Sequence, residues 1–365
     1  MGRFKRLHRT TLAVGLAGLA GCAGVMIGRP TAVPGRGPLG TPQPTATQIA
    51  VGGNPSPSAP RMNPFVAQLK RPPERAARNP YGWLEDVRSP RTRHWIAVES
   101  RAATKALAAI PQRGWIRNRL EQLQGGWSSQ TFRDVVVERI LYLSPDGARL
   151  PMEIAHRRDM PRDGNQPTLL TVYHPGGRTS EPFLRPFVLV WVEMGGVYAR
   201  AEVRNGLAKV AAAPGAAKLP DRPISLTDLF AAAQSLIDGH YTRRARLGIY
   251  GRGFGGLMAG TAVTQRPDFF GAALPTGTWA QYRQIPSGHC YPPTLIVTAE
   301  HDGDFRPWRG YELAAALQAE QLCGRPILIR VDEGEGPGAP PSVRLDRAAD
   351  ELAFAAKWLG AQPPQ

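Results

Sequence analysis

Apolar residues change their spacing along the chain in a way that separates two kinds of element. Short apolar and β-branched runs predict strands, and longer segments with an apolar residue every three or four positions predict helices. The predicted strands span residues 139–143, 150–156, 168–173, 197–203, 247–250, 272–275, 294–299 and 327–331. The predicted helices span residues 90–110, 114–123, 182–194, 225–240, 256–265, 308–322 and 345–359. The early strands follow one another closely and the later ones alternate with helices, which indicates an α/β fold with a mostly parallel sheet and helices on both faces.

Two local features refine this pattern. Ser225 and Asp228, three residues apart at the start of the 225–240 helix, resemble a capping box. In a parallel sheet, reacting groups lie beyond the carboxyl ends of the strands, so the residues that follow the strands are the candidates for a functional site.

The amino terminus has the layout of an export signal. Four basic residues lie within residues 1–9, and residues 12–20 form an apolar run that is shorter than the roughly twenty residues of a membrane span. The run ends in Leu19-Ala20-Gly21-Cys22, which resembles the bacterial lipoprotein processing box. We therefore predict a signal peptide over residues 1–21 and a lipid anchor on Cys22, whose thiolate would take up the acyl-glyceryl group. An ordinary signal peptide with an incidental cysteine is the alternative.

Residues 22–78 predict a tether. This stretch is rich in Pro, Gly, Thr, Ala and Ser and holds few large apolar residues, so it buries too little surface to fold by itself. Together with the signal, it predicts a protein anchored by lipid in the bacterial cell envelope, facing the periplasm or the exterior. The sequence leaves open which membrane carries the anchor.

Composition and charge narrow the choice of partners. The chain has 365 residues and a net charge of +16, which favours anionic partners unless it only reflects an arginine-biased composition. No run of five basic residues and no recognition-helix or stacking motif is present, so we expect no nucleic-acid partner. Three cysteines are too few for a disulfide scaffold or a zinc cluster.

A glycine-rich turn follows the strand at residues 247–250. Residues 251–256 read Gly-Arg-Gly-Phe-Gly-Gly. They fit the dinucleotide-binding pattern Gly-x-Gly-x-x-Gly, but no clear ribose-binding acid follows about twenty residues later, and we expect no cofactor. The turn also has the shape of a nucleophile elbow, with a strand, a tight turn flanked by glycines and a helix. Its middle residue, which normally carries the nucleophile, is Gly253.

This turn lies inside a longer resemblance. The segments 79–87, 144–152, 167–177, 195–198, 226–237, 264–268, 298–302 and 334–338 resemble, in this order, segments of the prolyl oligopeptidase family of serine peptidases. The resemblance implies an N-terminal helical segment over residues 79–126 and an α/β-hydrolase domain over residues 127–361. In most members a β-propeller caps the hydrolase domain. The short stretch between Leu123 and Ile140 has no room for one.

The resemblance also implies roles for individual residues, and two of the catalytic ones are replaced. Gly253 stands where the family has its serine nucleophile, and Glu335 stands where it has its histidine. Asp302 matches the acid of the triad. Tyr173 matches the tyrosine that stabilises the oxyanion, and Phe254 matches the residue whose backbone N–H shares that role.

Loss of the nucleophile predicts loss of peptidase activity. Acyl transfer on this fold needs an attacking oxygen and a base, and Gly253 has no side chain. We therefore predict a pseudoenzyme that binds a peptide or an envelope partner. The alternative is an active serine-type hydrolase of narrowed specificity, with water activated by Glu335 or with an unrecognised nucleophile.

Three further expectations concern the surroundings of this site. Asp302 and Glu335 are expected to face each other, near Asp304 and Asp332, either as solvated loop acids or as a receptor for a basic group. We expect no metal, although a hard cation is a third reading of such a cluster. Phe254 is expected to fill the space of the missing side chains. Cys290 and Cys323 fall at one edge of the sheet, so a disulfide and two free thiols are about equally expected.

Overall fold

A computed structural model describes residues 79–126, 133–174, 183–204, 224–277, 285–301, 306–335 and 339–364. For residue 301 and residues 333–335, only the backbone is described. The predicted signal peptide, Cys22 and nearly all of the tether lie outside the described residues, and so does Asp302.

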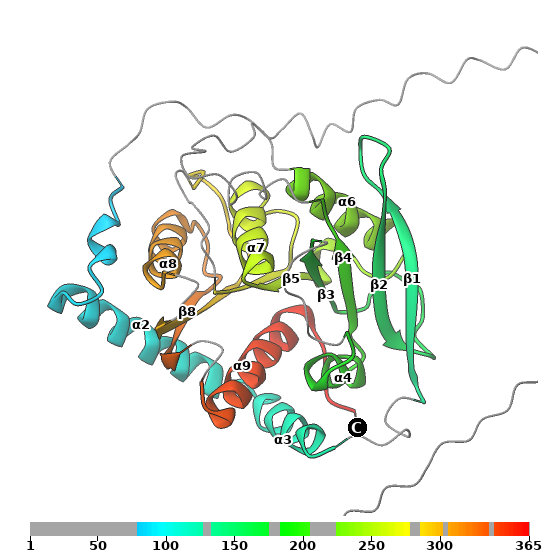
Figure 1. The fold of residues 1–365 in the computed structure, drawn as a ribbon, viewed down its shortest axis with the longest axis horizontal. Coiled ribbons are helices and arrows are strands. Elements are labelled where there is room, and N and C mark those ends of the chain that lie inside the picture. The colour runs from blue at the N-terminus through cyan, green and yellow to red at the C-terminus, as the bar shows by residue number, and fades with distance from the viewer. Residues whose placement is uncertain are drawn as a thin grey trace, which may run out of the picture. The chain divides into compact units, whose positions relative to one another are not determined.

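Eight strands form one sheet in the order β1-β2-β4-β3-β5-β6-β7-β8 (Figure 1). The strands are β1 Val135–Leu143, β2 Arg149–Arg157, β3 Thr168–Tyr173, β4 Val197–Glu202, β5 Leu247–Arg252, β6 Ala272–Thr276, β7 Thr294–His301 and β8 Ile327–Glu335. β2 is antiparallel to β1 and to β4, and every other pair is parallel. The carboxyl ends of β3 to β8 therefore meet at one edge of the sheet.

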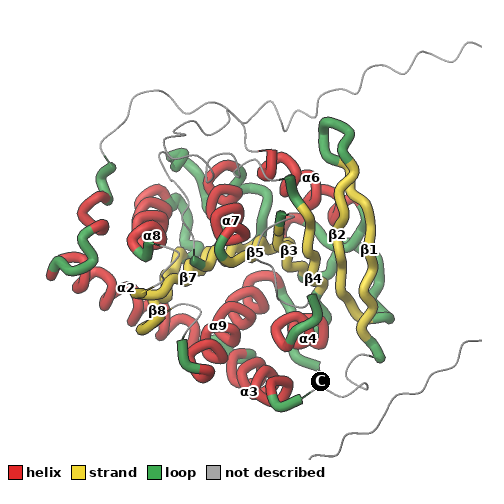
Figure 2. Tube along the Cα trace, in the orientation of Figure 1, coloured by secondary structure: helices red, strands yellow, loops and turns green. Residues whose placement is uncertain are grey.

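Helices cover both faces of the sheet, as Figure 2 shows. The helices are η1 Gly82–Glu85, α2 Pro90–Ala108, α3 Arg113–Gln124, α4 Pro186–Glu193, α6 Ile224–Asp238, η2 Arg244–Arg246, α7 Phe254–Gln265, α8 Trp308–Glu320 and α9 Pro341–Leu359. Buried residues of α6, α7 and α8 belong to one apolar cluster, and those of α3, α4 and α9 belong to another. α2 packs along β8 and contributes side chains to both clusters, so it covers one edge of the sheet.

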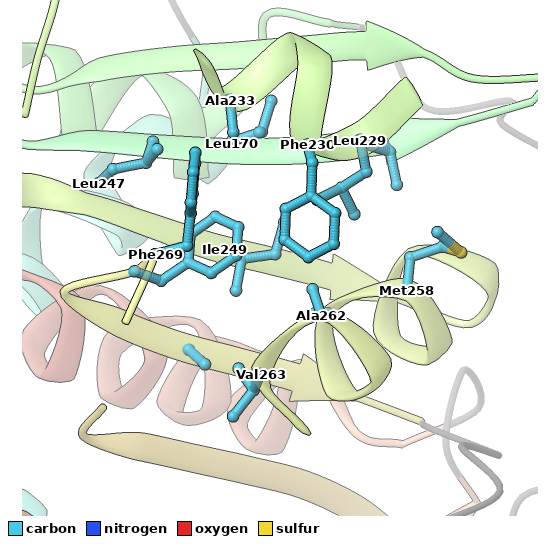
Figure 3. Close-up of a cluster of buried hydrophobic side chains, with 14 of the residues drawn as sticks. Leu170, Leu229, Phe230, Ala233, Leu247, Ile249, Met258, Ala262, Val263 and Phe269 are labelled. Atoms are coloured by element: carbon cyan, nitrogen blue, oxygen red, sulfur yellow. The ribbon is translucent and has the colours of Figure 1, made fainter. Parts of the chain in front are cut away.

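The central strand β5 explains why a continuous apolar run marks a strand here. Ile249 faces the first cluster, with Leu170, Phe230 and Phe269 (Figure 3), whereas its neighbour Tyr250 faces the second. Because alternate side chains point to opposite faces of a sheet, a strand buried on both faces has to be apolar throughout.

The α/β-hydrolase architecture predicted from the sequence is confirmed. Each predicted strand and helix is present, and the differences are at their ends. β1 starts at Val135, because it continues to pair with β2 as far as Arg157. All named strands of the described residues belong to the single sheet, so this part of the chain holds no β-propeller. Nor does any described helix have the length and apolar character needed to cross a membrane.

The predicted capping box is wrong. Ser225 is the second described residue of α6, and its buried hydroxyl has no hydrogen-bond partner among the described residues. Asp228 is fully buried and accepts hydrogen bonds from Ser144 Oγ at 2.6 Å and from the backbone N–H of Arg204 at 2.9 Å. The carboxylate is therefore used between distant segments, where the guanidinium of Arg204 also pairs with it at 2.7 Å.

Candidate functional site at the strand-to-helix elbow

The turn between β5 and α7 is held by backbone contacts. Gly253 has φ 55° and ψ −117°, a left-handed conformation that glycine adopts without steric cost. Its N–H donates to the carbonyl oxygen of Thr276 at 3.1 Å, and its own carbonyl accepts from Leu257 N–H at 2.9 Å. The sharp turn of a nucleophile elbow is therefore present, with no side chain at its apex.

Two flanking glycines are required by close approach rather than by conformation. A Cβ on Gly251 would lie 2.3 Å from the backbone of Gly255. A Cβ on Gly256 would lie 2.3 Å from the carbonyl oxygen of Thr276. These distances leave no room for any other residue, because the opposing atoms belong to the backbone of the turn and of β6.

The end of β3 lies against the elbow. A Cβ on Gly255 would meet the carbonyl oxygen of Val172 at 3.3 Å, so the two backbones approach closely. The rings of His174 and Phe254 meet edge to face, with their centroids 4.7 Å apart. The structure thus places the end of β3, where Tyr173 precedes His174, beside the elbow that holds Gly253 and Phe254.

The hydroxyl group of Tyr173 makes a hydrogen bond that the sequence did not indicate. Its hydroxyl donates to Glu202 Oε2 at 3.1 Å. Burial raises the pKa of Tyr173, and the hydrogen bond to the Glu202 carboxylate raises it further. The hydroxyl therefore stays protonated and points its proton at a carboxylate. Only the parallel register of β3 and β4, which pairs Tyr173 with Glu202, reveals this contact.

The two remaining triad positions are only partly described. Glu335 ends β8, and its backbone is in register with His301 at the end of β7. The carboxyl ends of the two strands are therefore neighbours, as predicted. The side chain of Glu335 and the whole of Asp302 and Asp304 lie outside the description, so their mutual approach stays a prediction. Within the described ranges, no group of three or more His, Cys, Asp or Glu side chains is arranged to hold a metal ion.

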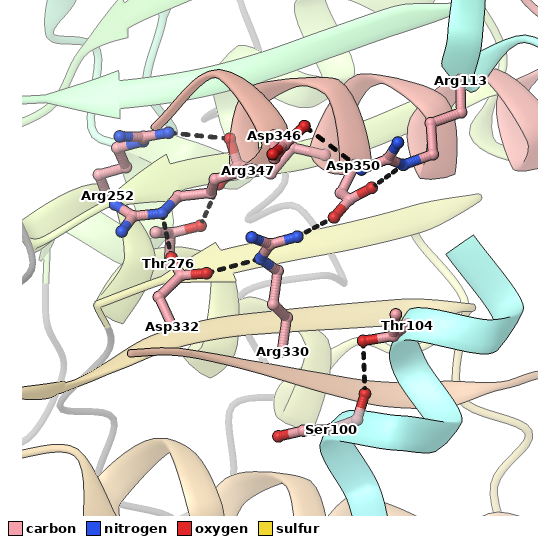
Figure 4. A network of polar contacts seen from close by, with 11 residues as sticks. Ser100, Thr104, Arg113, Arg252, Thr276, Arg330, Asp332, Asp346, Arg347 and Asp350 are labelled. Carbon is pink, nitrogen blue, oxygen red and sulfur yellow. Dashed lines mark hydrogen bonds and ion pairs between the residues drawn. The ribbon is translucent and has the colours of Figure 1, made fainter. Parts of the chain in front are cut away.

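Asp332 does not belong to an open acidic cluster, contrary to its place in the sequence analysis. It is buried and accepts hydrogen bonds from Arg330 Nε at 2.6 Å and from Arg347 Nε (Figure 4). Arg330 also binds Asp350, which accepts a further bond from Arg113 at 2.5 Å. Arg330 and Asp332 are two residues apart on β8, and side chains at this spacing share one face of a strand. Asp332 therefore faces α9, and the positive charges of Arg330 and Arg347 balance its negative charge.

A fully buried carboxylate on the same helix binds residues beside the elbow. Glu351 of α9 accepts Arg252 Nη2 at 3.0 Å and Thr276 Oγ1 at 2.8 Å. Arg252 precedes Gly253, and the carbonyl of Thr276 receives the N–H of Gly253. The carboxylate therefore ties together the ends of β5 and β6 directly beneath the turn.

Cys290 and Cys323 form a disulfide, with their Cα atoms 5.3 Å apart. Cys290 precedes β7 and Cys323 follows α8, which agrees with their predicted position at one edge of the sheet.

Comparison with known proteins agrees with this geometry. The sequence profile described as "Prolyl oligopeptidase family" matches residues 185–287 and 276–362. A prolyl endopeptidase of Elizabethkingia miricola is 28% identical over 262 residues, which cover 62% of this chain and 37% of that protein. An uncharacterized peptidase of Rickettsia prowazekii is 31% identical over 261 residues, with 62% and 36% coverage.

Solved structures give the same result. A structure from a study of two prolyl endopeptidases aligns with a TM-score of 0.55 at 28% identity, and covers 63% of this chain and 39% of its own. The chain therefore spans a little over a third of the length of the relatives that it matches.

Proposed function

Because this chain carries a prolyl oligopeptidase-like α/β-hydrolase domain of the serine peptidase class, we propose that it is a catalytically inactive relative of these enzymes. It acts by binding a peptide or an envelope partner. In this proposal the hydrolase scaffold is retained as a binding platform, and the bond-breaking chemistry of the family is lost.

One observation carries the proposal, namely a glycine at the apex of an intact elbow. Gly253 retains the backbone conformation in which an elbow presents its nucleophile, but it offers no atom that can attack a carbonyl. No serine of the chain lies in a Gly-x-Ser-x-Gly context that could replace it. An oxyanion therefore has no means of forming at this position.

The neighbouring side chains support the proposal. A tyrosine that stabilises an oxyanion has to donate its hydroxyl proton to the substrate. Tyr173 instead donates to Glu202, so a substrate would have to displace this bond. Phe254 packs against His174 and adds aromatic surface where the catalytic serine and histidine of the family would react.

The proposal includes a location in the bacterial cell envelope. The basic and apolar amino terminus, the Leu-Ala-Gly-Cys sequence and the Pro-rich tether support a lipid on Cys22 and a domain held away from the membrane. Metabolic labelling with a palmitate analogue tests this part separately. Label that persists after Cys22→Ala contradicts the assignment.

The main test measures activity directly. The purified protein is incubated with a fluorophosphonate probe and with proline-containing chromogenic peptides, beside an active prolyl endopeptidase as positive control. We expect no labelled serine and no turnover in the wild type. The double variant Gly253→Ser/Glu335→His restores the serine and histidine of the family. Labelling of the serine introduced at position 253 would show that only the chemical groups were missing.

The alternative is an active hydrolase of narrowed specificity. It is favoured by the retained Asp302 and by a carboxylate, Glu335, at the end of the neighbouring strand. Turnover by the wild type that Glu335→Gln or Asp302→Asn abolishes would establish this alternative and contradict our proposal. Turnover unchanged in both variants and in a mock purification would indicate a contaminant.

A further inference from the structure

The first long helix of the domain has two different sides. α2 covers the β8 edge of the sheet with Thr92, Ala103 and Leu107, which are buried. The hydroxyl of Ser89 accepts the N–H of Thr92 and caps the helix. With 19 residues and about 1.5 Å of rise per residue, the helix presents a straight outer face about 28 Å long.

The outer face of α2 is basic. Its exposed residues include four cations, which are Arg91, Arg93, Arg101 and Lys105. The acidic residue of the helix, Glu99, is half-buried and accepts a hydrogen bond from Gln318 at 2.8 Å. The exposed positions of α2 therefore carry four positive charges and no negative charge. Val98, which is 46% exposed, adds an apolar side chain between Arg93 and Arg101 in the sequence.

These cations differ from several exposed arginines that are paired with carboxylates elsewhere in the domain. Arg157 pairs with Asp159 at 2.7 Å, and Arg162 pairs with Glu138 at the same distance. Within the part of the chain that the structure describes, none of the four α2 cations forms an ion pair with a carboxylate. Arg91 lies over the ring of Trp83, 4.0 Å from its centroid, which leaves its charge exposed.

Two exposed carboxylates lie just before the helix. Glu85 and Asp86 are exposed on and just after η1, before the helix begins. Arg88 follows them and is also exposed. The central and carboxyl-terminal turns, with Arg101 and Lys105, lie several turns away from these acids. The exposed charges of the second half of α2 are therefore positive, and its nearest acid along the helix, Glu99, is half-buried.

We propose that the outer face of α2 docks the domain on an anionic phospholipid surface. Exposed cations along one helix suit a layer of anionic headgroups, and basic residues near such a surface each add to the binding energy. Docking adds a second membrane contact to the lipid of the proposed function, and two such signals hold a protein more firmly than one. The described part of the chain begins at Asn79, so α2 is the first long helix after the predicted tether in the sequence.

Vesicle sedimentation tests the docking face without the lipid anchor. The probe protein is the mature chain from residue 22 with Cys22→Ala, and the vesicles contain phosphatidylcholine with or without phosphatidylglycerol. We expect binding only with phosphatidylglycerol, weakened by high salt. Arg93→Glu/Arg101→Glu/Lys105→Glu should weaken it by at least about tenfold. Because this protein cannot be lipidated at residue 22, the result is independent of whether Cys22 is acylated in cells.

The matched control reverses three exposed cations elsewhere, in Arg139→Glu/Arg149→Glu/Arg325→Glu, and should retain binding. Thermal unfolding and circular dichroism establish that both triple variants are folded. Equal losses in the two variants would attribute binding to net charge and overturn the proposal, as would full binding by the α2 variant. Binding of duplex DNA that the α2 substitutions abolish, with vesicle binding unchanged, would assign the face to nucleic acid instead.

Discussion

The elbow and the buried ionic network are bound by adjacent residues of α9, Glu351 and Asp350, yet they are specified in different ways. The elbow is a matter of backbone shape, since glycines at 251 and 256 allow contacts that any Cβ would block. The network is a matter of side-chain charge, since Asp332, Asp350 and Glu351 are each buried against arginine. The elbow therefore requires residues without side chains, and the ionic network requires side chains of opposite charge in contact.

If the proposed function is correct, this difference explains how the hydrolase fold is kept although the nucleophile is lost. A side chain at position 253 contributes chemistry, but the turn is formed by hydrogen bonds of the backbone. Removal of one partner from a buried ion pair, in contrast, leaves an uncompensated charge. Substitution of catalytic residues at this site is therefore expected to cost little stability. Substitution of a single residue of the ionic network is expected to cost much more.

The largest effect is expected at Glu351. Glu351→Ala removes the carboxylate that binds Arg252 and Thr276 and leaves a buried cavity, so we expect a loss of about 3–5 kcal/mol in the free energy of unfolding. Glu121→Ala is the matched control, because Glu121 is exposed and pairs only with Arg117 among the described residues. Its loss should stay within about 0.5 kcal/mol in urea denaturation. Similar values for the two variants would contradict the importance of burial.

The next effect tests the shape of the elbow. Gly256→Ala places a methyl group 2.3 Å from the carbonyl oxygen of Thr276, and we expect a loss of about 3 kcal/mol because β6 and α7 have to separate. Gly114→Ala in α3 adds a methyl group with nothing within 4 Å and should stabilise the protein by up to about 1 kcal/mol. A neutral Gly256→Ala would show that the turn yields easily.

A smaller effect is expected at the apex. Gly253→Ser imposes a left-handed conformation on a residue with a side chain, at a cost of about 1–2 kcal/mol. The variant should fold and stay inactive, because the position of the histidine still holds Glu335. Gly147→Ser, at φ 88° in an open turn, is the control for conformational cost alone. A loss far above that of the control would mean that the apex also lacks space.

The smallest effect is expected in the pH dependence of stability, through Glu138 of β1 and the side chains that bind it. Burial acts to raise the pKa of Glu138, but hydrogen bonds from Tyr241, Arg162 and His156 lower it to about 2. Because the pKa of Glu138 is lower in the folded protein, its carboxylate stabilises the fold at pH values above its pKa in the unfolded chain, 4.5. This contribution disappears as the pH falls from 4.5 toward 2. Because its side chain is 30% exposed, we expect only about 1 kcal/mol.

Glu138→Gln measures this contribution. Wild type and variant should differ in stability at neutral pH and converge near pH 2, when both are followed by thermal unfolding across the range. A constant difference at every pH would assign the effect of the substitution to packing instead of charge.

The local sequence pattern was enough to predict much of the fold and the residue at the apex of the elbow. The alternation of strands and helices, the glycine spacing and the missing serine at 253 depend on neighbours in sequence, so they could be predicted. The roles of Glu202, His174 and Glu351 could not, since each partner is distant in sequence or is chosen by strand register. The capping-box prediction failed for the same reason, because Asp228 binds Ser144 and Arg204 of other segments.

The amino-acid sequence alone thus predicted an α/β-hydrolase fold with a glycine at the apex of its elbow, because periodicity, turn chemistry and residue identity are properties of short stretches. The tertiary structure decided which charges are available. Asp332 follows the predicted strand at residues 327–331 but lies in β8 and is bound by two arginines. The cations of α2, at the edge of the sheet, have no carboxylate partner among the described residues. Burial and pairing depend on the contacts between segments, and those contacts exist only once the chain has folded.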